Sequence, residues 1–333
     1  MITIALDAFG SSGAPLTEIK GAVAFISDSP PGSVRVLVAG PAQRIREILQ
    51  KEAPELSSDS IQVVNAPEII KLTDPPGDVL KSKADSSMKA VIDLLKVKRA
   101  DVAVSMGNTG AMMALSSFIT GRVEGIGRPA IPIIAPVPGG EPVIIIDGGA
   151  NVDCRPPHLA AFGLMGSVLY SHLFDIKSPK VAILNIGKSS NKGGAVVQEA
   201  YERLLESGLN FIGNVESGAV LSGVADVVVC DGFVGNIFLK FAESIPDLLD
   251  RFAGGSLIGP DLKGSLSFFN RSEYGGAPLL GVKGSVVIGH SNIDAKGVRN
   301  ALSFAAENRL FDISGKIESF IKSANNKIKE IIK

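Results

Sequence analysis

Short turns rich in glycine, asparagine and threonine recur along this sequence, and they carry most of the side chains that could do chemistry. In "SMGNTG" (105–110), Asn108 and Thr109 place neutral hydrogen-bond donors directly after an apolar run. A helix that starts at such a turn presents unpaired N–H groups and the positive end of its dipole. We therefore expect this turn to hold a phosphate group, or a carbonyl oxygen that becomes negatively charged.

Similar turns follow other predicted strands. In an open sheet of parallel strands, ligands bind beyond the carboxyl ends of the strands. Tight-turn chemistry alone explains any one of these segments, but six of them together favour a long cleft in which main chain approaches a ligand. The other five are "DAFGSSG" (7–13), "DGGANVD" (147–153), "NIGKSSNKGG" (185–194), "GNVESG" (213–218) and "DGFVGN" (231–236).

Several familiar catalytic and nucleotide-binding motifs are missing from the sequence. It has no G-x-G-x-x-G and no G-x-S-x-G, and Gly187-Lys188-Ser189 lacks the first glycine of a P-loop because Ala182 stands there. No His/Cys/carboxylate cluster has zinc spacing, so we expect no metal and no cofactor. His158 and His172 fall in a predicted helix, whereas His290 follows a predicted strand and is the better candidate for an acid.

The elements that position these turns are predicted by alternating apolar runs and helical segments. Most of the runs are apolar throughout, which is typical of strands buried on both faces. This pattern predicts a doubly wound α/β fold, with a mostly parallel sheet covered by helices on both faces, over residues 1–333 as one domain or as two lobes. The predicted strands are 2–6, 34–38, 61–64, 101–105, 131–135, 143–146, 181–185, 210–212, 227–230 and 286–288, and the predicted helices include 85–96, 156–173, 192–206 and 293–308.

Residues 241–271 do not fit this alternation. Apolar residues recur there at helical spacing around Gly254-Gly255 and Gly259-Pro260, which predicts a helical hairpin inserted in the fold. On one interpretation these apolar residues pack in a core. On the other, they contact a membrane, an acyl carrier or a dimer partner.

The composition of the chain excludes several classes of protein. The net charge of −1 argues against a general nucleic-acid binder, and two cysteines, Cys154 and Cys230, cannot form a disulfide framework. The start "MITIALDAFG" has the pattern of a first strand and lacks the basic region of a signal peptide. No stretch of 18 residues is both apolar and free of charge and proline, so we expect no transmembrane helix and a cytoplasmic location.

Many ordered segments of the chain resemble the PlsX family of phosphate acyltransferases, which act on acyl carrier protein. The likeness runs nearly end to end, and the number of ordered matches makes it far more specific than "GNTGA" alone. It is carried by "IALDAFG", "KADSSMKA", "SMGNTGAMMA", "GIGRPAI", "GGANVDC", "MGSVLY", "NIGKSSNKGG", "NFIGNVE", "ADVVVCDGFVGNIFLK", "YGGAPLLGVKG" and "VVIGHS".

The resemblance implies that inorganic phosphate attacks a fatty acyl thioester on acyl carrier protein, giving acyl phosphate for phospholipid synthesis. It also implies a fold similar to isocitrate and isopropylmalate dehydrogenases, a homodimer, peripheral membrane contact, and delivery of the product to a membrane glycerol-3-phosphate acyltransferase. Phosphate is anionic at pH 7, so this reaction needs aligned reactants and oxyanion donors more than an activated nucleophile.

Our residue assignments combine this resemblance with position at strand ends. Asn108 and Thr109 are assigned to the oxyanion, and His290 to protonation of the leaving thiolate. Phosphate is assigned to Gly232, Gly235, Asn236, Lys240 and Lys192, and the lining of the cleft to Lys83, Ser86, Ser87, Asn151, Asp153, Asn214, Glu216 and Asp231.

The chain departs from the family pattern at several of these turns. Where the family usually has Met-Gly-Gly-Asp, this chain has Phe9-Gly10-Ser11-Ser12, so a cleft carboxylate is absent from the loop. The basic run before Ser86-Ser87 keeps two of four positions because Ser82 and Ala84 replace the others, and Ser291 follows His290 where the family has glycine. Two alternatives stay open at this point: a dehydrogenase on the same fold, and a non-catalytic binder of acyl carrier protein or membrane.

Overall fold

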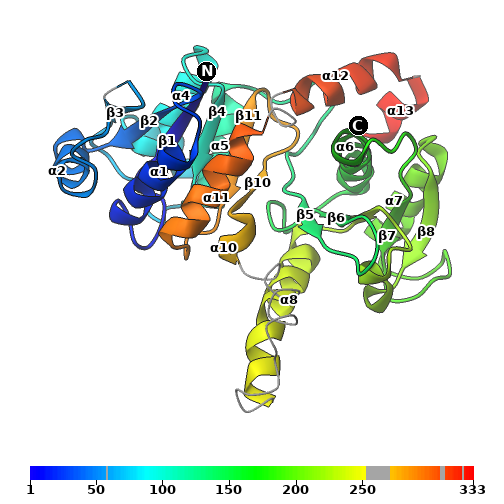
Figure 1. The fold of residues 1–333 in the computed structure, drawn as a ribbon. Helices are drawn as coiled ribbons and strands as arrows, with labels where there is room; N and C mark the ends of the chain where they lie inside the picture. The colour runs from blue at the N-terminus through cyan, green and yellow to red at the C-terminus, as the bar shows by residue number, and fades with distance from the viewer. Residues whose placement is uncertain (58, 253–270, 308–311, 325) are drawn as a thin grey trace. The chain divides into compact units, whose positions relative to one another are not determined.

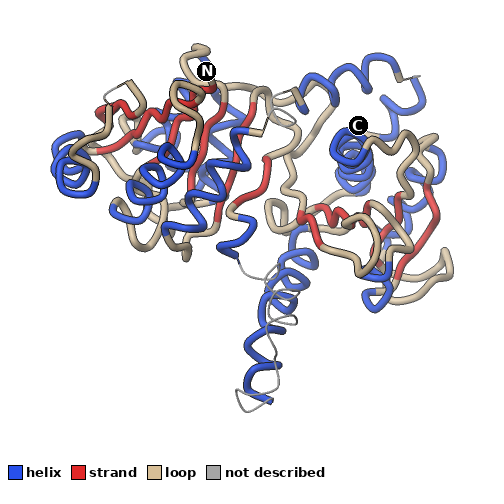
Figure 2. The backbone as a smooth tube through the Cα atoms, viewed as in Figure 1, coloured by secondary structure: helices blue, strands red, loops and turns tan. Residues whose placement is uncertain are grey.

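The computed structural model describes residues 1–333 except residues 58, 253–270, 308–311 and 325. The chain divides into two compact units. Unit 1 joins Met1–Gly121 with Gly264–Phe311, and unit 2 joins Arg122–Lys263 with Asp312–Lys333. Both units are therefore discontinuous in sequence, and each has its own sheet with helices packed on it (Figures 1 and 2).

The sheet of unit 1 has six strands in the order β10-β11-β4-β1-β2-β3. β10 is antiparallel to its neighbour, and the other five strands are parallel. Ile4 pairs with Val36 on one side and Val102 on the other, and all three are fully buried. The strands are β1 (Ile2–Asp7), β2 (Val34–Gly40), β3 (Ile61–Asn65), β4 (Val102–Ser105), β10 (Gly276–Pro278) and β11 (Ser285–Gly289).

Helices cover both faces of this sheet. α1 and α11 lie side by side over one face, with Ile19 and Val298 in the core beneath them (Figure 1). The connection from β3 to β4 runs back across the sheet, so a right-handed crossover places α4 on the opposite face. The helices of unit 1 are α1 (Leu16–Asp28), α2 (Ala42–Glu52), α3 (Pro76–Ser82), α4 (Ser87–Lys96), α5 (Thr109–Ile119), α10 (Arg271–Tyr274) and α11 (Ala295–Ala306).

The sheet of unit 2 has five strands in the order β5-β6-β9-β7-β8, with β5 antiparallel and the others parallel. α6 packs closely on it because Gly163 and Gly166 face Val229 and Val227 of the central strand. The elements are β5 (Ile133–Ala135), β6 (Val143–Ile146), α6 (Pro156–Phe174), β7 (Val181–Leu184), α7 (Ala195–Glu206), β8 (Phe211–Val215), the 3₁₀ helix η1 (Ser217–Ser222), β9 (Val227–Val229), α8 (Gly232–Phe252), α12 (Ile313–Ser323) and α13 (Asn326–Ile331).

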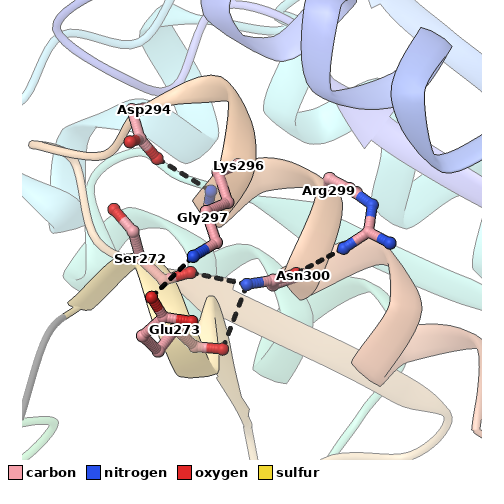
Figure 3. Close-up of polar contacts among 7 residues, drawn as sticks. All are labelled: Ser272, Glu273, Asp294, Lys296, Gly297, Arg299 and Asn300. Carbon is pink, nitrogen blue, oxygen red and sulfur yellow. Dashed lines mark hydrogen bonds and ion pairs between the residues drawn. The ribbon is translucent and has the colours of Figure 1, made fainter. Parts of the chain in front are cut away.

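The start of α11 is fixed by contacts with α10 (Figure 3). Asp294 caps the helix by accepting from the N–H of Gly297 at 2.8 Å. Lys296 Nζ lies 2.6 Å from Glu273 Oε1, and Asn300 Nδ2 donates to the carbonyl oxygen of Ser272 at 2.7 Å. The segment that precedes α11, which carries His290, therefore runs into a helix whose first turns are held in place.

Two differences from the sequence-based expectation concern the architecture. The strands form two separate sheets where one doubly wound sheet was predicted, and each sheet has one antiparallel edge strand. The short strand β10 was not predicted because Gly276 and Pro278 are poor strand formers.

The predicted helical hairpin over residues 241–271 is described only in part. The helix α8 is described as far as Phe252, and the chain is described again from Arg271 onward. The residues between them lie outside the described part. Among the helices that the structure describes, none is both long and apolar enough to span a bilayer.

Candidate active site

The turns after β1, β4 and β11 come together in unit 1 because these three strands are neighbours in the sheet. Gly10 lies so close to the main chain of Met106 and Gly107 that a Cβ atom there would be 2.7–2.9 Å from their atoms. Gly289 faces the Met106 side chain in the same way. Glycine at these two positions lets the three turns pack directly on one another.

A buried carboxylate, Asp7, ends β1 beneath these turns. It accepts from Ser105 Oγ at 2.7 Å and from the N–H of Phe9 at 3.1 Å, and the Ser87 hydroxyl also bonds to it. Burial raises the pKa of Asp7, and these hydrogen bonds act in the opposite direction. The Ser105 hydroxyl in turn accepts from the N–H of Gly107, so Asp7 anchors the "SMGNTG" turn.

Asn108 caps α5 and fastens a neighbouring loop to it. Its Oδ1 accepts from the N–H of Ala111 at 3.0 Å. Its Nδ2 donates to three main-chain oxygens, those of Lys71, Leu72 and Asp74, at 2.9–3.2 Å. The side chain predicted to donate to an oxyanion is therefore a tether in this structure, and a donation to substrate would require these bonds to break.

The other predicted residues of unit 1 lie near the same turns in different settings. Ser86 is buried and caps α4, with Oγ 3.4 Å from the N–H of Lys89, and its hydroxyl donates to the carbonyl oxygen of Lys83 at 2.9 Å. Thr109 is the first residue of α5. His290 Nδ1 accepts from the N–H of Asn292 at 3.1 Å, so the neutral ring carries its proton on Nε2.

In unit 2, Asp147 organises the turn after β6. It is fully buried, and its two oxygens accept from the N–H groups of Ile131, Gly149, Ala150 and Asn151 at 2.7–3.3 Å. Burial raises the pKa of Asp147, and the hydrogen bonds counter this effect. A carboxylate that receives this many N–H donors holds its turn in one conformation.

The first turn of α8 packs on this Asp147 turn. Gly232 N–H donates to the carbonyl oxygen of Asn151 at 2.7 Å. A Cβ atom at Gly235 would lie only 1.9 Å from the main-chain oxygen of Asp147. Asp231 caps the helix, since its Oδ1 accepts from the N–H of Val234 at 2.8 Å. Glycine at 232 and 235 thus serves helix packing, and Asp231 serves helix capping.

Three of the predicted phosphate ligands are polar side chains near this turn. The Asn236 side chain covers Gly149, where a Cβ atom would lie 3.4 Å from Asn236 Cβ. Lys240 is one turn further along α8 on the same side of the helix and is exposed. The exposed Lys192 follows β7, the other neighbour of β9, and its aliphatic part lies against Gly187.

The remaining predicted cleft residues of unit 2 divide into tethers and exposed groups. Asn151 Nδ2 donates to the carbonyl oxygen of Pro129 at 2.7 Å and to Asp147 Oδ2 at 2.9 Å. Asn214 Nδ2 donates to the carbonyl oxygen of Ser189 at 2.7 Å and so holds the 185–194 turn. Asp153 and Glu216 are exposed.

The comparisons with known proteins are decisive for the family. A family model described as "Fatty acid synthesis protein" matches residues 2–312. A phosphate acyltransferase of Dictyoglomus turgidum is 41% identical over 327 residues, covering 94% of this chain and 96% of the relative. The chain belongs to the PlsX family of phosphate acyltransferases. A phosphate acyltransferase of Clostridium acetobutylicum is 36% identical over 331 residues, covering 95% and 98% of the two chains.

Solved structures show how widely this fold is used. A phosphotransacetylase of Streptococcus pyogenes has a TM-score of 0.62 at 19% identity, covering 92% of this chain and 93% of that one. A 4-hydroxythreonine-4-phosphate dehydrogenase of Klebsiella pneumoniae has a TM-score of 0.55 at 14% identity, covering 93% and 98%. At these identities the similarity concerns the fold alone.

The thiols of this phosphate acyltransferase family member are poor nucleophiles in the structure. Cys154 and Cys230 are both buried and free. Burial, with the nearby charges of Asp147 and Asp231, raises the pKa of Cys154 to about 12 and that of Cys230 as well. Both are therefore protonated at neutral pH, which disfavours a covalent thioester step on either one.

Sequence reasoning missed three acidic residues that organise the turns of this family member: Asp7, Glu18 and Asp147. Each is 2% exposed or less. The available signal was a single acid that closes an apolar run, "IALD" for Asp7 and "VIIID" for Asp147. Glu18 gave no such signal, because an acid in the first turn of a helix is common at the surface.

Proposed function

We propose that this protein transfers a fatty acyl group from the thioester of acyl carrier protein to inorganic phosphate, giving acyl phosphate for phospholipid synthesis. Membership of the phosphate acyltransferase family supports transfer of an acyl group to phosphate. The observation that carries the residue-level proposal is the packing of α8 on the Asp147 turn, where the Asn236 side chain covers Gly149 and the exposed Lys240 follows one turn further along α8.

In the proposed reaction, an oxygen of bound hydrogen phosphate attacks the thioester carbonyl carbon, and the carbonyl oxygen becomes an oxyanion. The carbon–sulfur bond then breaks, which yields acyl phosphate and the thiolate of the carrier. The thiolate takes up the acidic proton that the attacking hydrogen phosphate brought, and His290 Nε2–H donates a hydrogen bond to the sulfur as negative charge develops on it, so that protons balance and the ring stays neutral. No protein nucleophile is needed, which agrees with the protonated state of both cysteines.

Two sets of residues carry this proposal. Phosphate is held by Asn236, Lys240 and Lys192 and by the main chain around Gly232 and Gly235. The oxyanion is held at the start of α5, where the first N–H groups of a helix lack partners within the helix. Thr109 lies at this start, and Asn108 contributes by fixing the turn through its cap and its three donations.

We further propose a homodimer in the cytoplasm that contacts the membrane surface and passes its product to a membrane glycerol-3-phosphate acyltransferase. The support is an apolar stripe on α8. Phe233, Ile237 and Phe241 are spaced four apart and are 56%, 54% and 64% exposed, and Phe252 further along is 81% exposed. Sedimentation with anionic phospholipid vesicles tests the membrane contact: Phe241→Ser with Phe252→Ser should reduce binding, and unchanged binding would contradict it.

The direct test of function combines purified protein, long-chain acyl carrier protein and phosphate. We expect hydroxylamine to trap acyl phosphate as the hydroxamate, with one free carrier thiol released per hydroxamate and no product when phosphate is omitted. Release of free fatty acid in place of hydroxamate would identify a thioesterase. Carrier binding without turnover would identify a non-catalytic binder, and saturable NAD binding with turnover would identify a dehydrogenase.

A further inference from the structure

Glu18 is a buried acid in the first turn of α1 that has no part in the proposed reaction. Its side chain is 0% exposed, and Oε1 accepts from the N–H of Ser11 at 2.6 Å. Ser11 lies in the turn between β1 and α1, so the carboxyl group reaches back from the helix to hold the turn that precedes it. An acid so deeply buried is costly unless its hydrogen bonds matter to the fold or to the site.

The hydrogen-bonding capacity of Glu18 and its neighbour Ser11 is only partly used. Among the described residues, Glu18 Oε2 and Ser11 Oγ are both buried without a hydrogen bond of normal geometry, although the Ser11 hydroxyl faces the carboxyl group. The charged group that acts on it is Asp7, at the end of β1. Buried polar atoms left in this state are uncommon in native proteins, and each calls for an explanation.

The turn that Glu18 holds is bonded to the segment that carries His290. Ser12, the residue after Ser11, donates its N–H to the carbonyl oxygen of Ser291 at 2.8 Å. The next N–H along that segment, from Asn292, donates to His290 Nδ1. A continuous path of hydrogen bonds and single peptide units therefore runs from the Glu18 carboxyl group to the imidazole ring.

We propose that Glu18 is a positioning residue that holds the Ser11–Ser12 turn against Ser291 and thereby fixes the orientation and tautomer of His290. This rests on the proposed function, in which His290 Nε2–H donates a hydrogen bond to the leaving thiolate. Glu18 itself touches no reacting atom in this proposal. Its effect reaches the reaction through His290 alone, and this defines the tests.

The first test needs no turnover. Nitrogen-15 NMR of the imidazole rings distinguishes the two neutral tautomers, and the chain has only three histidines, so loss of one signal in His290→Ala assigns the resonance. We expect His290 to be the Nε2–H tautomer in the wild type and in Glu18→Gln, which keeps an acceptor for Ser11. In Glu18→Met, of similar size but without an acceptor, we expect a tautomer mixture and at least tenfold faster amide exchange at Ser11 and Ser12.

The second test measures acyl phosphate formation in a double-mutant cycle. Glu18→Met should lower kcat about tenfold with little change in the KM for phosphate, and Glu18→Gln should restore most of the rate. In the His290→Ala background, Glu18→Met should have no further effect on kcat. The exposed Glu47, changed to Met, is the matched control and should leave both readouts unchanged.

Two results would overturn the proposal. One is an unaltered His290 spectrum in Glu18→Met, and the other is an equal loss of kcat from Glu18→Met with and without His290. If the wild type makes no acyl phosphate at all, the proposed function fails, while the NMR result still decides whether Glu18 positions His290. The two failures are therefore distinguishable.

Discussion

Asn151 bonds to Asp147 twice: its main-chain N–H donates to Asp147 Oδ2 at 2.7 Å, and its side-chain Nδ2 donates to the same oxygen at 2.9 Å. Nδ2 also donates to the carbonyl oxygen of Pro129, so one amide group joins three segments of unit 2. Since α8 starts against this turn, the geometry of the proposed phosphate site depends on the pair.

Changing Asn151 should therefore weaken unit 2. Asn151→Ala removes both side-chain donations, and we expect a loss of about 2 kcal/mol in the free energy of unfolding. Asn151→Asp should cost more, because it places a second buried acid against Asp147. Urea unfolding measures both variants. Asn210→Ala, which removes a single exposed bond to Ser178, is the control, and a loss in Asn151→Ala no larger than in the control would contradict the role.

Gly235 should not tolerate a side chain. Alanine there would place Cβ 1.9 Å from the Asp147 main-chain oxygen, so the first turn of α8 must move away from the turn after β6. We expect Gly235→Ala to raise the KM for phosphate at least tenfold and to speed amide exchange at residues 232–236. Gly218→Ala, at a position with no atom within 4 Å, is the matched control in the same unit. Equal kinetics in the two variants would show that this close contact is unimportant.

The two functions of the Asn108 side chain can be separated. Asn108→Asp keeps an acceptor for the N–H of Ala111 but places oxygen against three carbonyl oxygens, so it removes the tether while leaving the cap. We expect it to release the 71–74 loop, measured by faster amide exchange there, and to slow turnover by about 10²–10³ because the start of α5 shifts. An active variant with unchanged exchange would show that the tether matters neither to the 71–74 loop nor to turnover.

The proposed phosphate ligands on α8 should act mainly on phosphate. Asn236→Ala and Lys240→Ala should each raise the KM for phosphate more than the KM for acyl carrier protein, because the carrier thioester does not depend on these side chains in the proposed reaction. Initial rates over a matrix of both substrate concentrations measure this. Lys51→Ala, an exposed lysine on α2, is the control for a general loss of positive charge. Unchanged phosphate dependence in both variants would contradict the assignment.

Stability should fall as pH rises because of Glu18. Burial raises the pKa of Glu18 to about 7 from an ordinary 4.5, so between these values the folded protein binds a proton that the unfolded chain has released. Its contribution is complete below pH 4.5 and is lost as pH rises through about 7, to a limit of about 3 kcal/mol. Glu18→Gln should flatten this fall in urea unfolding between pH 4.5 and pH 8.

Asp7 lies beside Glu18 and its pKa is raised in the same direction, so a smaller fall should persist in Glu18→Gln. The same pH dependence in wild type and variant would mean that Glu18 ionises normally in the folded protein.

The positions of the site turns could be predicted from the sequence, but the roles of their asparagines could not. Apolar runs ending in glycine and asparagine correctly placed turns after β1, β4, β6, β7 and β9, because buried parallel strands have a clear apolar signature. Asn108, Asn151 and Asn214 looked like ligand donors, yet their amides bond to main-chain oxygens of segments up to 37 residues away. Such pairings depend on tertiary structure, which local sequence does not encode.

The division of the strands into two sheets could not be predicted from the local sequence pattern either. The edge strand β10 carries no feature that separates it from a loop, and the pattern that correctly predicted a strand at 131–135 does not show that β5 is antiparallel. β11 joins β4 across more than 170 residues of intervening chain. The acids Asp147 and Glu18 gave a weak signal or none, because burial of an acid becomes visible only when its donors are placed by the fold.

The discontinuity of unit 1 has a consequence for synthesis on the ribosome. β4 has β1 on one side, but its other neighbour, β11, is translated only after most of unit 2 has emerged. The nascent polypeptide therefore exposes an unpaired strand edge, apolar over Val102–Val104, for most of its elongation, and such edges invite self-association. His290 arrives with the strand that closes this edge, so the newborn protein gains the turn of its proposed catalytic histidine and its protection against aggregation in a single late event.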